Sequence, residues 1–235
     1  MEKVVYLVWR DPKEDVDPFA ARLRGDLAAR LRALPTLRGL QLNVADAAVA
    51  AGSGLRQTFL DPPPDAVLQV WVDSAIAPLR QPVDAAIAAA TARHAAYLVT
   101  ESRPLRNRQH PPQPGQRTEG FAQIALLRKP ARLSYGQWLD VWHNSHTQIA
   151  IDTQSTFEYA QNVVVRPLTA GAPPLDAMVE ECFPLAALTD PLTFFDAPGD
   201  KAKFEANLKI MMDSVHRFID MGTIDVMPTS QYVLL

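Results

Sequence analysis

Short apolar runs that are typical of buried β-strands alternate along this chain with stretches of helical periodicity. The strand-like runs are, in order, VVYLVW, LQLNV, DAVLQVWVD, AYLVTES, IALL, YAQNVVV, DAMVEECFP and IDVMPTSQYVL. After the first run of each half, and again before the last run, apolar residues recur every three or four positions, as they do on the buried face of a helix. The pattern therefore predicts the element order β-α-β-β-α-β twice.

A proline-rich segment separates the two halves. Residues 103–119 read RPLRNRQHPPQPGQRTE and contain few apolar residues. Proline fixes φ and lacks a backbone N–H, so such a segment is expected to be neither a central strand nor a helix. We therefore predict two units, residues 1–102 and 120–235, with residues 103–119 as the linker between them.

The two units match each other element by element, which indicates an internal duplication. Their second strands share an Asn-Val pair that begins at Asn43 and at Asn162. A β-α-β-β-α-β unit of this size is typical of the ferredoxin-like fold, a four-stranded antiparallel sheet with two helices on one face. Strands such as VVYLVW are apolar on both sides, so the bare sheet faces need to be covered. We predict an α+β fold in which two tandem ferredoxin-like units pack their sheets as a barrel, within one chain or across a dimer.

Composition narrows the classes of function. The 235 residues are 48% apolar, and the net charge of −3 comes without a basic run, so no nucleic-acid partner is expected. No apolar run approaches the roughly 20 residues of a membrane span, and the first run is too short for a signal peptide. We therefore expect a cytoplasmic protein with no membrane partner. The single cysteine, Cys182, argues against an internal disulfide or a cysteine-based zinc site, and we expect it to be a small buried hydrophobe.

The segment SYGQWLDVWHNSHTQIA, which begins at Ser134, holds two of the four tryptophans and two of the five histidines. Ser134 is the expected N-cap of a helix. Four residues turn an α-helix by about 400°, so Trp138, Trp142 and His146 are predicted to lie in one stripe, with His143 turned away from it. The stripe can be an aromatic core with a hydrogen-bonded structural histidine, or it can carry an imidazole into a pocket.

The spacing S-x-x-x-W-x-x-x-W-x-x-x-H, followed by a strand with Tyr and Asn and by a strand with Asp and Glu, resembles the EthD family. That family belongs to the dimeric α+β barrel superfamily, whose members have ferredoxin-like units. The resemblance covers residues 120–235, whereas residues 1–102 share only the order of elements. It implies a role in the breakdown or tailoring of small organic molecules, although many members have no assigned chemistry. The motif positions correspond here to Trp142, His146, Tyr159, Asn162 and Glu180.

The predicted catalytic groups are His146, Asn162 and Glu180. An uncharged imidazole in a hydrophobic pocket can take or give a proton near neutral pH. Asn162 can orient a carbonyl or enolate oxygen. A buried Glu180 can orient the imidazole or act as a second acid/base, and the alternative is an exposed or edge-strand glutamate. Tyr159 lies three positions from Asn162 and so faces the opposite side of a regular strand, and we prefer Asn162 for the site.

Substrate-binding roles are predicted for Trp142, Trp138, Tyr159 and His143. No metal is predicted, because His143 and His146 share a helix side but no third ligand stands at a suitable spacing. The matching helix of the first unit has leucines in its stripe and no histidine. This difference favours a single site in the second unit, with the first unit as scaffold or as part of the wall.

We predict a cofactor-independent enzyme that uses His146 as general acid/base on a small, largely apolar or aromatic compound, as an isomerase, lyase, dehydratase or oxygenase. Two alternatives remain: a haem-binding α+β barrel protein, and a protein that binds a small hydrophobic ligand without turning it over. No phosphate-binding glycine loop or serine-hydrolase motif is present. A homodimer is expected. Residues 48–65 and 189–200 are long enough to be lids or dimer contacts, and the Phe-Phe pair of the second segment can cap the pocket.

Overall fold

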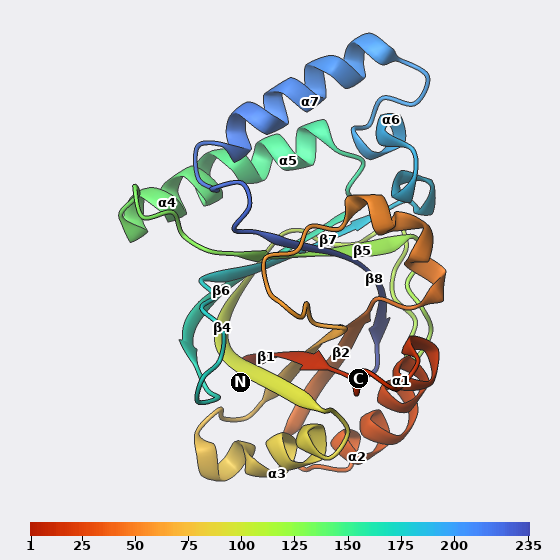
Figure 1. Cartoon of the computed structure of the whole chain (residues 1–235), viewed down its shortest axis with the longest axis vertical. Coiled ribbons are helices and arrows are strands. Elements are labelled where there is room, and N and C mark those ends of the chain that lie inside the picture. Colours follow the sequence, from red (N-terminus) through yellow and green to blue (C-terminus); the bar gives the residue numbers. More distant parts are fainter.

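Eight antiparallel strands close into one barrel in the computed structural model, which describes residues 1–235 (Figure 1). In sequence order the strands are β1 (Glu2–Trp9), β2 (Leu37–Val44), β3 (Ala66–Val72), β4 (Arg93–Leu105), β5 (Phe121–Leu127), β6 (Glu158–Pro167), β7 (Ala177–Phe183) and β8 (Asp225–Val233). Around the barrel they follow the order β1-β3-β2-β8-β5-β7-β6-β4. Every run that the sequence predicted as a strand forms one.

Each half of this order is one ferredoxin-like sheet. The N-terminal sheet runs β4-β1-β3-β2, and the C-terminal sheet runs β8-β5-β7-β6. The two sheets join at both edges, because β2 pairs with β8 and β4 pairs with β6. The predicted α+β fold of two tandem ferredoxin-like units is therefore confirmed, and the barrel closes within one chain.

Helices cover the outside of the barrel on two opposite sides (Figure 1). Those of the N-terminal unit are α1 (Val16–Arg22), the π turn η1 (Leu23–Leu27), α2 (Ala28–Arg32), the 3₁₀ segment η2 (Ala47–Leu55) and α3 (Ala77–Ala88). Those of the C-terminal unit are α4 (Tyr135–Val141), the π turn η3 (Trp142–His146), α5 (Thr147–Thr153), the 3₁₀ segment η4 (Leu185–Leu188), α6 (Pro191–Phe194) and α7 (Lys201–Val215). Not one of them pairs the length with the apolar character that crossing a bilayer requires.

The first helix of each unit is interrupted at the same place by a five-residue π turn, η1 in one unit and η3 in the other. A π turn is wider than an α turn and is frequent at functional sites. The shared interruption supports the predicted duplication. It also means that Trp138, Trp142 and His146 do not lie on the regular α-helical stripe that their spacing predicted.

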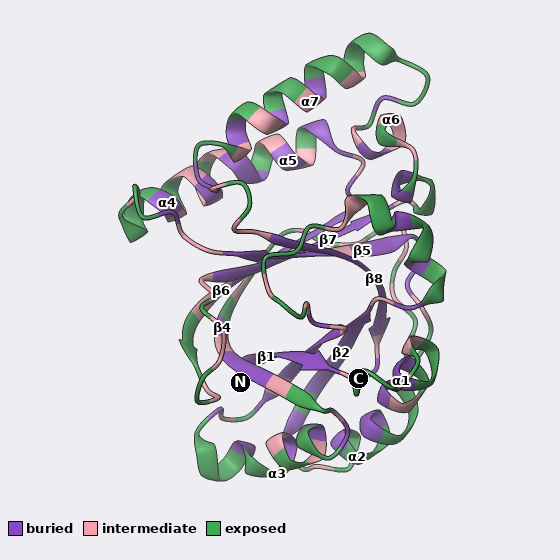
Figure 2. Cartoon of the chain, in the orientation of Figure 1, coloured by how far each residue is buried: buried purple, intermediate pink, exposed green.

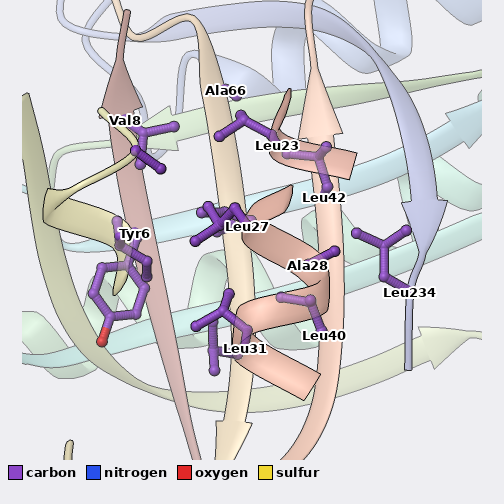
Figure 3. Packing of buried hydrophobic residues seen from close by; sticks show 14 of the residues in the cluster. Tyr6, Val8, Leu23, Leu27, Ala28, Leu31, Leu40, Leu42, Ala66 and Leu234 are labelled. Carbon is purple, nitrogen blue, oxygen red and sulfur yellow. The ribbon is translucent and has the colours of Figure 1, made fainter. Parts of the chain in front are cut away.

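The N-terminal unit has a continuous apolar core between its sheet and its helices. Figure 3 shows Leu23, Leu27 and Leu31 of the helix beside Tyr6 and Leu40 of the sheet. Fully burying one such side chain stabilises a fold by roughly 1.5–3 kcal/mol. The buried positions of this core are apolar, and they correspond to equivalent positions in the C-terminal unit.

A second apolar cluster fills part of the barrel interior and joins the two units. It takes Val5 and Leu7 from β1, Ile124 and Leu126 from β5, and Met178 from β7. The strands are buried along most of their length, as Figure 2 shows. Because side chains alternate along a strand, the residues between these point outward, toward the helices.

Regular strand structure continues past the predicted start of the linker. β4 extends to Leu105. Its ladder with β6 shifts register between Ser102 and Leu105, so Pro104, which lacks a backbone N–H, can lie in this strand without breaking the ladder. Further along, the linker runs beside β8, where the Thr118 N–H donates to the Gln231 carbonyl. The connection between the two units is therefore attached to the barrel.

Candidate functional site

A cavity of about 650 Å³ lies between the outer face of the C-terminal sheet and the helices that cover it. Strands β5 to β8 form its floor, and η3, α7 and the segment around η4 and α6 form its walls. The 3₁₀ segment η2 of the N-terminal unit completes one wall. The lining is mostly apolar and includes Trp142, Phe194, Phe195, Met211, Met212 and Phe218. This volume is typical of small-molecule sites.

Local hydrogen bonds set the direction of the helix that carries His146. A capping box begins α4: Ser134 Oγ accepts from the Gln137 N–H, and the Gln137 side chain accepts from the Ser134 N–H. At the end of the π turn, the Thr147 hydroxyl donates to a backbone carbonyl of the turn over 2.8 Å. The same hydroxyl accepts from the side-chain amide of Gln161 on β6 over 2.7 Å. The predicted N-cap is confirmed, and the π turn is tied to the sheet.

His146 lines the cavity and is only 7% exposed. Its Nδ1 lies 3.0 Å from Ser214 Oγ on α7, and its ring packs against Phe218 with the ring centroids 4.5 Å apart. Its Nε2 makes no hydrogen bond within the protein. Burial, with a smaller contribution from the Arg217 guanidinium, lowers the pKa of His146 to about 4. The imidazole is therefore neutral at pH 7, and Nε2 can accept a proton when Nδ1 donates to Ser214.

Trp142 and Tyr159 line the cavity beside His146, and Trp142 Nε1 donates to Tyr159 Oη over 3.2 Å. Trp138 and His143 do not reach it. Trp138 is fully buried against Trp142, with its Nε1 donating to the Phe218 carbonyl, and the His143 ring packs on the Trp142 ring. Of the four residues predicted to bind substrate, the structure therefore brings Trp142 and Tyr159 to the cavity and places Trp138 and His143 away from its wall.

Asn162 and Glu180, the other two predicted catalytic residues, lie on the opposite face of the sheet from His146. Asn162 pairs in register with Met178, which belongs to the barrel interior, and its Nδ2 donates to the Met178 carbonyl over 3.4 Å. The prediction that they share a pocket with His146 is wrong, because alternate residues of a strand face opposite sides. Tyr159, predicted to bind substrate although Asn162 was preferred for the site, is the residue of the two that faces the cavity.

Glu180 holds the two units together inside the barrel. Its carboxyl oxygens accept hydrogen bonds of 2.7 to 2.8 Å from four side-chain amides, those of Gln41, Asn43, Gln69 and Gln231. Three of these amides come from β2 and β3 of the N-terminal unit. Glu180 is therefore buried, as predicted, but it is neither near the imidazole nor exposed on an edge strand.

Glu181 is the carboxyl group that faces the cavity, and the sequence interpretation missed it. Its register partners are Gln123 on β5 and Tyr159 on β6, and both line the cavity with it. Glu181 Oε1 is buried without a hydrogen-bond partner. Burial alone raises the pKa of Glu181 to about 8, so the group is a carboxylic acid at pH 7.

The same ladder positions of the N-terminal unit are apolar. Val4, Val70 and Leu40 pair across β1, β3 and β2 as Gln123, Glu181 and Tyr159 pair across β5, β7 and β6. Similarly, the last residue of the π turn is a buried leucine in η1 and a histidine in η3. The C-terminal unit has therefore exchanged an apolar core for polar groups around a cavity. Aligning the two units strand by strand is the sequence signal that could have identified Glu181.

Residues 131–222 match the family model of the EthD domain. The C-terminal unit carries an EthD domain. The resemblance inferred from the sequence is therefore confirmed. Within the EthD domain lie the helix from α4 to α5, β6, β7 and α7, and with them His146, Tyr159 and Glu181. Gln123 and the η2 wall lie outside the matched residues, so the cavity combines the EthD domain with neighbouring parts of the chain.

The similarity to solved structures extends over both units. An anthrone oxidase-like protein has a TM-score of 0.59 at 9% sequence identity, with 99% of this chain and 93% of that chain covered. A candidate monooxygenase from Fusobacterium nucleatum subsp. nucleatum ATCC 25586 has a TM-score of 0.50 at 10% identity, with 100% of this chain and 92% of that chain covered. No curated protein matches the sequence. At these identities the likeness concerns the fold alone.

The structure holds no group of three or more His, Cys, Asp or Glu side chains that is arranged to bind a metal ion. The polar side-chain groups of the cavity wall are one imidazole, one carboxyl group, one phenol, one indole N–H, three side-chain amides and the Thr189 hydroxyl. Such a set can move a proton and bind an oxygen atom of a ligand.

Proposed function

We propose that this protein is an enzyme that acts without a cofactor on a small, largely apolar or aromatic compound, with His146 as the general base. The observation that carries the proposal is the position of one imidazole in an apolar cavity, with Nδ1 held by Ser214 and Nε2 left unpaired. An apolar core position is more simply filled by leucine, as the N-terminal unit does. An imidazole at this place therefore supports a chemical role.

The first step would be proton transfer from the substrate to Nε2. In the tautomer with Nδ1–H donating to Ser214, the lone pair of Nε2 is free to take the proton. The low pKa of His146 arises mainly from burial, which opposes the imidazolium. A substrate that becomes negative beside the ring would stabilise the imidazolium and strengthen the base. Ser214 acts as a positioning residue that holds the ring.

Proton removal can be the first step for an isomerase, a lyase, a dehydratase or a cofactor-free oxygenase. The related fold of an anthrone oxidase-like protein and of a candidate monooxygenase favours the oxygenase type among these. An anthrone is a neutral tricyclic ketone with an acidic CH₂ group. Removal of that proton gives an electron-rich carbanion that reacts with O₂. A compound of this kind fits the apolar lining and the unpaired imidazole.

The proposal is tested with purified protein and anthrone, by following O₂ uptake against a sample without protein. We expect His146→Ala to lower the protein-dependent rate about 100-fold or more, because general base catalysis contributes 10²–10⁴-fold. His216→Ala is the matched control, because His216 is exposed at the end of the same helix that carries Ser214. Undiminished turnover by a folded His146→Ala protein would remove His146 from the mechanism.

The two alternative functions have separate tests. Haem binding requires a Soret band when haem is added to the purified protein, and loss of that band in His146→Ala would favour it over the proposal. A carrier without catalysis requires displacement of a bound aromatic probe by anthrone with no product formed. The unpaired imidazole and carboxyl group favour catalysis over simple carriage, because an apolar wall alone is sufficient to hold an apolar ligand.

A further inference from the structure

We propose that Glu181 is the proton donor of this cavity, and that its substrates are neutral compounds whose acidic C–H bond adjoins a carbonyl group. This inference rests on the proposed function, in which His146 is the base. It adds the acid that completes the site and the functional group that a substrate must present to it.

Three polar side chains form a row across the cavity floor. Gln123 and Tyr159 flank Glu181 in register, so all three share the face that lines the cavity. Neither Glu181 nor Gln123 has a side-chain hydrogen bond within the protein, and Glu181 Oε1 is fully enclosed. Because buried polar groups are nearly always paired, the unpaired Glu181 Oε1 indicates a ligand that hydrogen-bonds to this row.

Packing does not explain this row. The N-terminal unit fills the corresponding three positions with Val4, Leu40 and Val70, all fully buried. The same backbone ladder is therefore compatible with an apolar surface at each position. A buried glutamate without a partner lowers the stability of the fold, so its presence indicates a role toward a ligand.

The groups around Glu181 select a neutral ligand. No lysine or arginine lines the cavity, His146 is its one histidine, and Glu181 is its one carboxyl group. The raised pKa of Glu181 keeps it protonated at pH 7, and burial also raises the pKa of Tyr159, which stays a phenol. An anionic ligand would meet no cation here, whereas a carbonyl oxygen can accept the Glu181 proton.

The proton transfers balance without an oxidant. His146 Nε2 takes the proton from the carbon next to the carbonyl, and the electron pair of that C–H bond forms a C=C bond while the C=O electron pair moves to oxygen. Glu181 gives its proton to this oxygen. The product is an enol, with His146 as imidazolium and Glu181 as carboxylate. Return of the protons restores the ketone. In D₂O the proton on the His146 imidazolium exchanges with solvent before it returns, so the carbon takes up deuterium.

The experiment uses 1-tetralone, a neutral bicyclic ketone, with the full-length protein in D₂O. Deuterium uptake at the carbon next to the carbonyl is followed by NMR. We expect Glu181→Gln to bind 1-tetralone within about threefold of the wild type, because the amide still donates a hydrogen bond. We expect its exchange rate to fall about 100-fold, because the amide has no proton to transfer. Asp213→Asn, at an exposed carboxylate of α7, is the matched control.

Two further readouts do not depend on turnover. The infrared band of a protonated carboxyl group is expected in the wild type, is expected to shift when 1-tetralone is added, and is expected to be missing in Glu181→Gln. Wild-type protein is expected to bind 1-tetralone at least about fivefold more tightly than tetralin, the hydrocarbon without the carbonyl. Glu181→Leu is expected to remove that preference.

The outcomes separate the two proposals. If exchange is lost in His146→Ala but stays within threefold of wild type in Glu181→Gln, Glu181 is not the acid and the proposed function stands. If His146→Ala exchanges as fast as wild type, the proposed function fails as well. If the wild type does not prefer 1-tetralone to tetralin, or binds the anion 1-naphthoate more tightly than either, the substrate class is overturned.

Discussion

Burial sets the protonation of His146, and this has a consequence for stability. The pKa of His146 in the fold is about 4, below the ordinary value of 6.5. Between these two pH values the unfolded chain binds a proton that the folded chain does not, so the free energy of unfolding falls as the pH falls from 6.5 to 4. The loss amounts to at most about 3 kcal/mol.

We therefore expect His146→Leu, which introduces the residue found at the same place in η1, to flatten the acid side of the stability curve. The measurement is urea unfolding of both proteins at pH 7 and at pH 4.5. Other groups titrate in this range, so the informative quantity is the difference between the two proteins. His216→Leu, at an exposed site, should keep the wild-type pH dependence. Equal pH dependence of wild type and His146→Leu would contradict the burial argument.

The pKa of Glu181 is raised rather than lowered, and loss of the Glu181 proton should limit activity at alkaline pH. With a pKa of about 8, the carboxyl group loses its proton above that pH and can no longer donate it. His146 remains neutral throughout this range, and the pKa of Tyr159 is raised away from it. We expect kcat/KM for deuterium exchange to fall as the pH rises through about 8 in the wild type. The low residual rate of Glu181→Gln should lack this limb, and a limb of the same midpoint in that variant would assign it to another group.

Two adjacent glutamates illustrate what sequence patterns can and cannot identify. The sequence located the strand that carries Glu180 and Glu181 and the helix that carries His146. The strand is buried on both faces, so its hydrophobic pattern does not reveal which residue of the pair points outward. Only the register with β5 and β6 decides this, and it assigns Glu181 to the cavity.

At the scale of elements, strands were easier to predict than the shape of a helix. Runs that are apolar on both faces predict buried strands, and their order predicted the two ferredoxin-like sheets. The π turn η3 could not be predicted, because residues spaced by four suit an α-helix and a π turn equally. For the same reason the spacing predicted Trp138 in one stripe with His146, whereas Trp138 does not line the cavity.

The hydroxyl of Thr147 is expected to stabilise the π turn. It donates to the Trp142 carbonyl and accepts from the Gln161 amide, so Thr147→Val leaves two buried polar groups without this partner. We expect a loss of about 1–3 kcal/mol in the free energy of unfolding, measured with urea. Thr153→Val is the matched control, because its hydroxyl makes one bond, to the carbonyl of Ile149. A loss no larger than that of the control would mean that the turn does not depend on this hydroxyl.

At the scale of the whole molecule, the duplication divides the work between two units. The N-terminal unit keeps an apolar core and lends η2 to the cavity wall, and the C-terminal unit carries the polar groups. Because the barrel closes within one chain, no second chain is needed to complete the sheet. The homodimer expected from the sequence stays a prediction. Light scattering measures it, and a dimer would have to use a surface outside the barrel seams.

Changing each of the two glutamates of β7 to glutamine should have contrasting effects on the free energy of unfolding and on the exchange activity. Glu180→Gln places an NH₂ group among the four amides that now donate to the carboxyl group, across the seam between the units. We expect it to lower the free energy of unfolding at pH 7 by about 2–3 kcal/mol. Its deuterium exchange on 1-tetralone should stay near wild type below the melting temperature, because Glu180 does not line the cavity.

Glu181→Gln should do the reverse. At pH 7 the unfolded chain ionises at this position while the fold holds a neutral acid, so the fold is destabilised by an amount that is absent below pH 4.5 and complete above about pH 8. Removing the ionisable group should raise the free energy of unfolding at pH 7 by about 2–3 kcal/mol, with the exchange activity lost. Paired urea unfolding and exchange rates measure both. A stability change of the same sign in the two variants would contradict the interpretation that one face of β7 stabilises the fold while the other face takes part in the reaction.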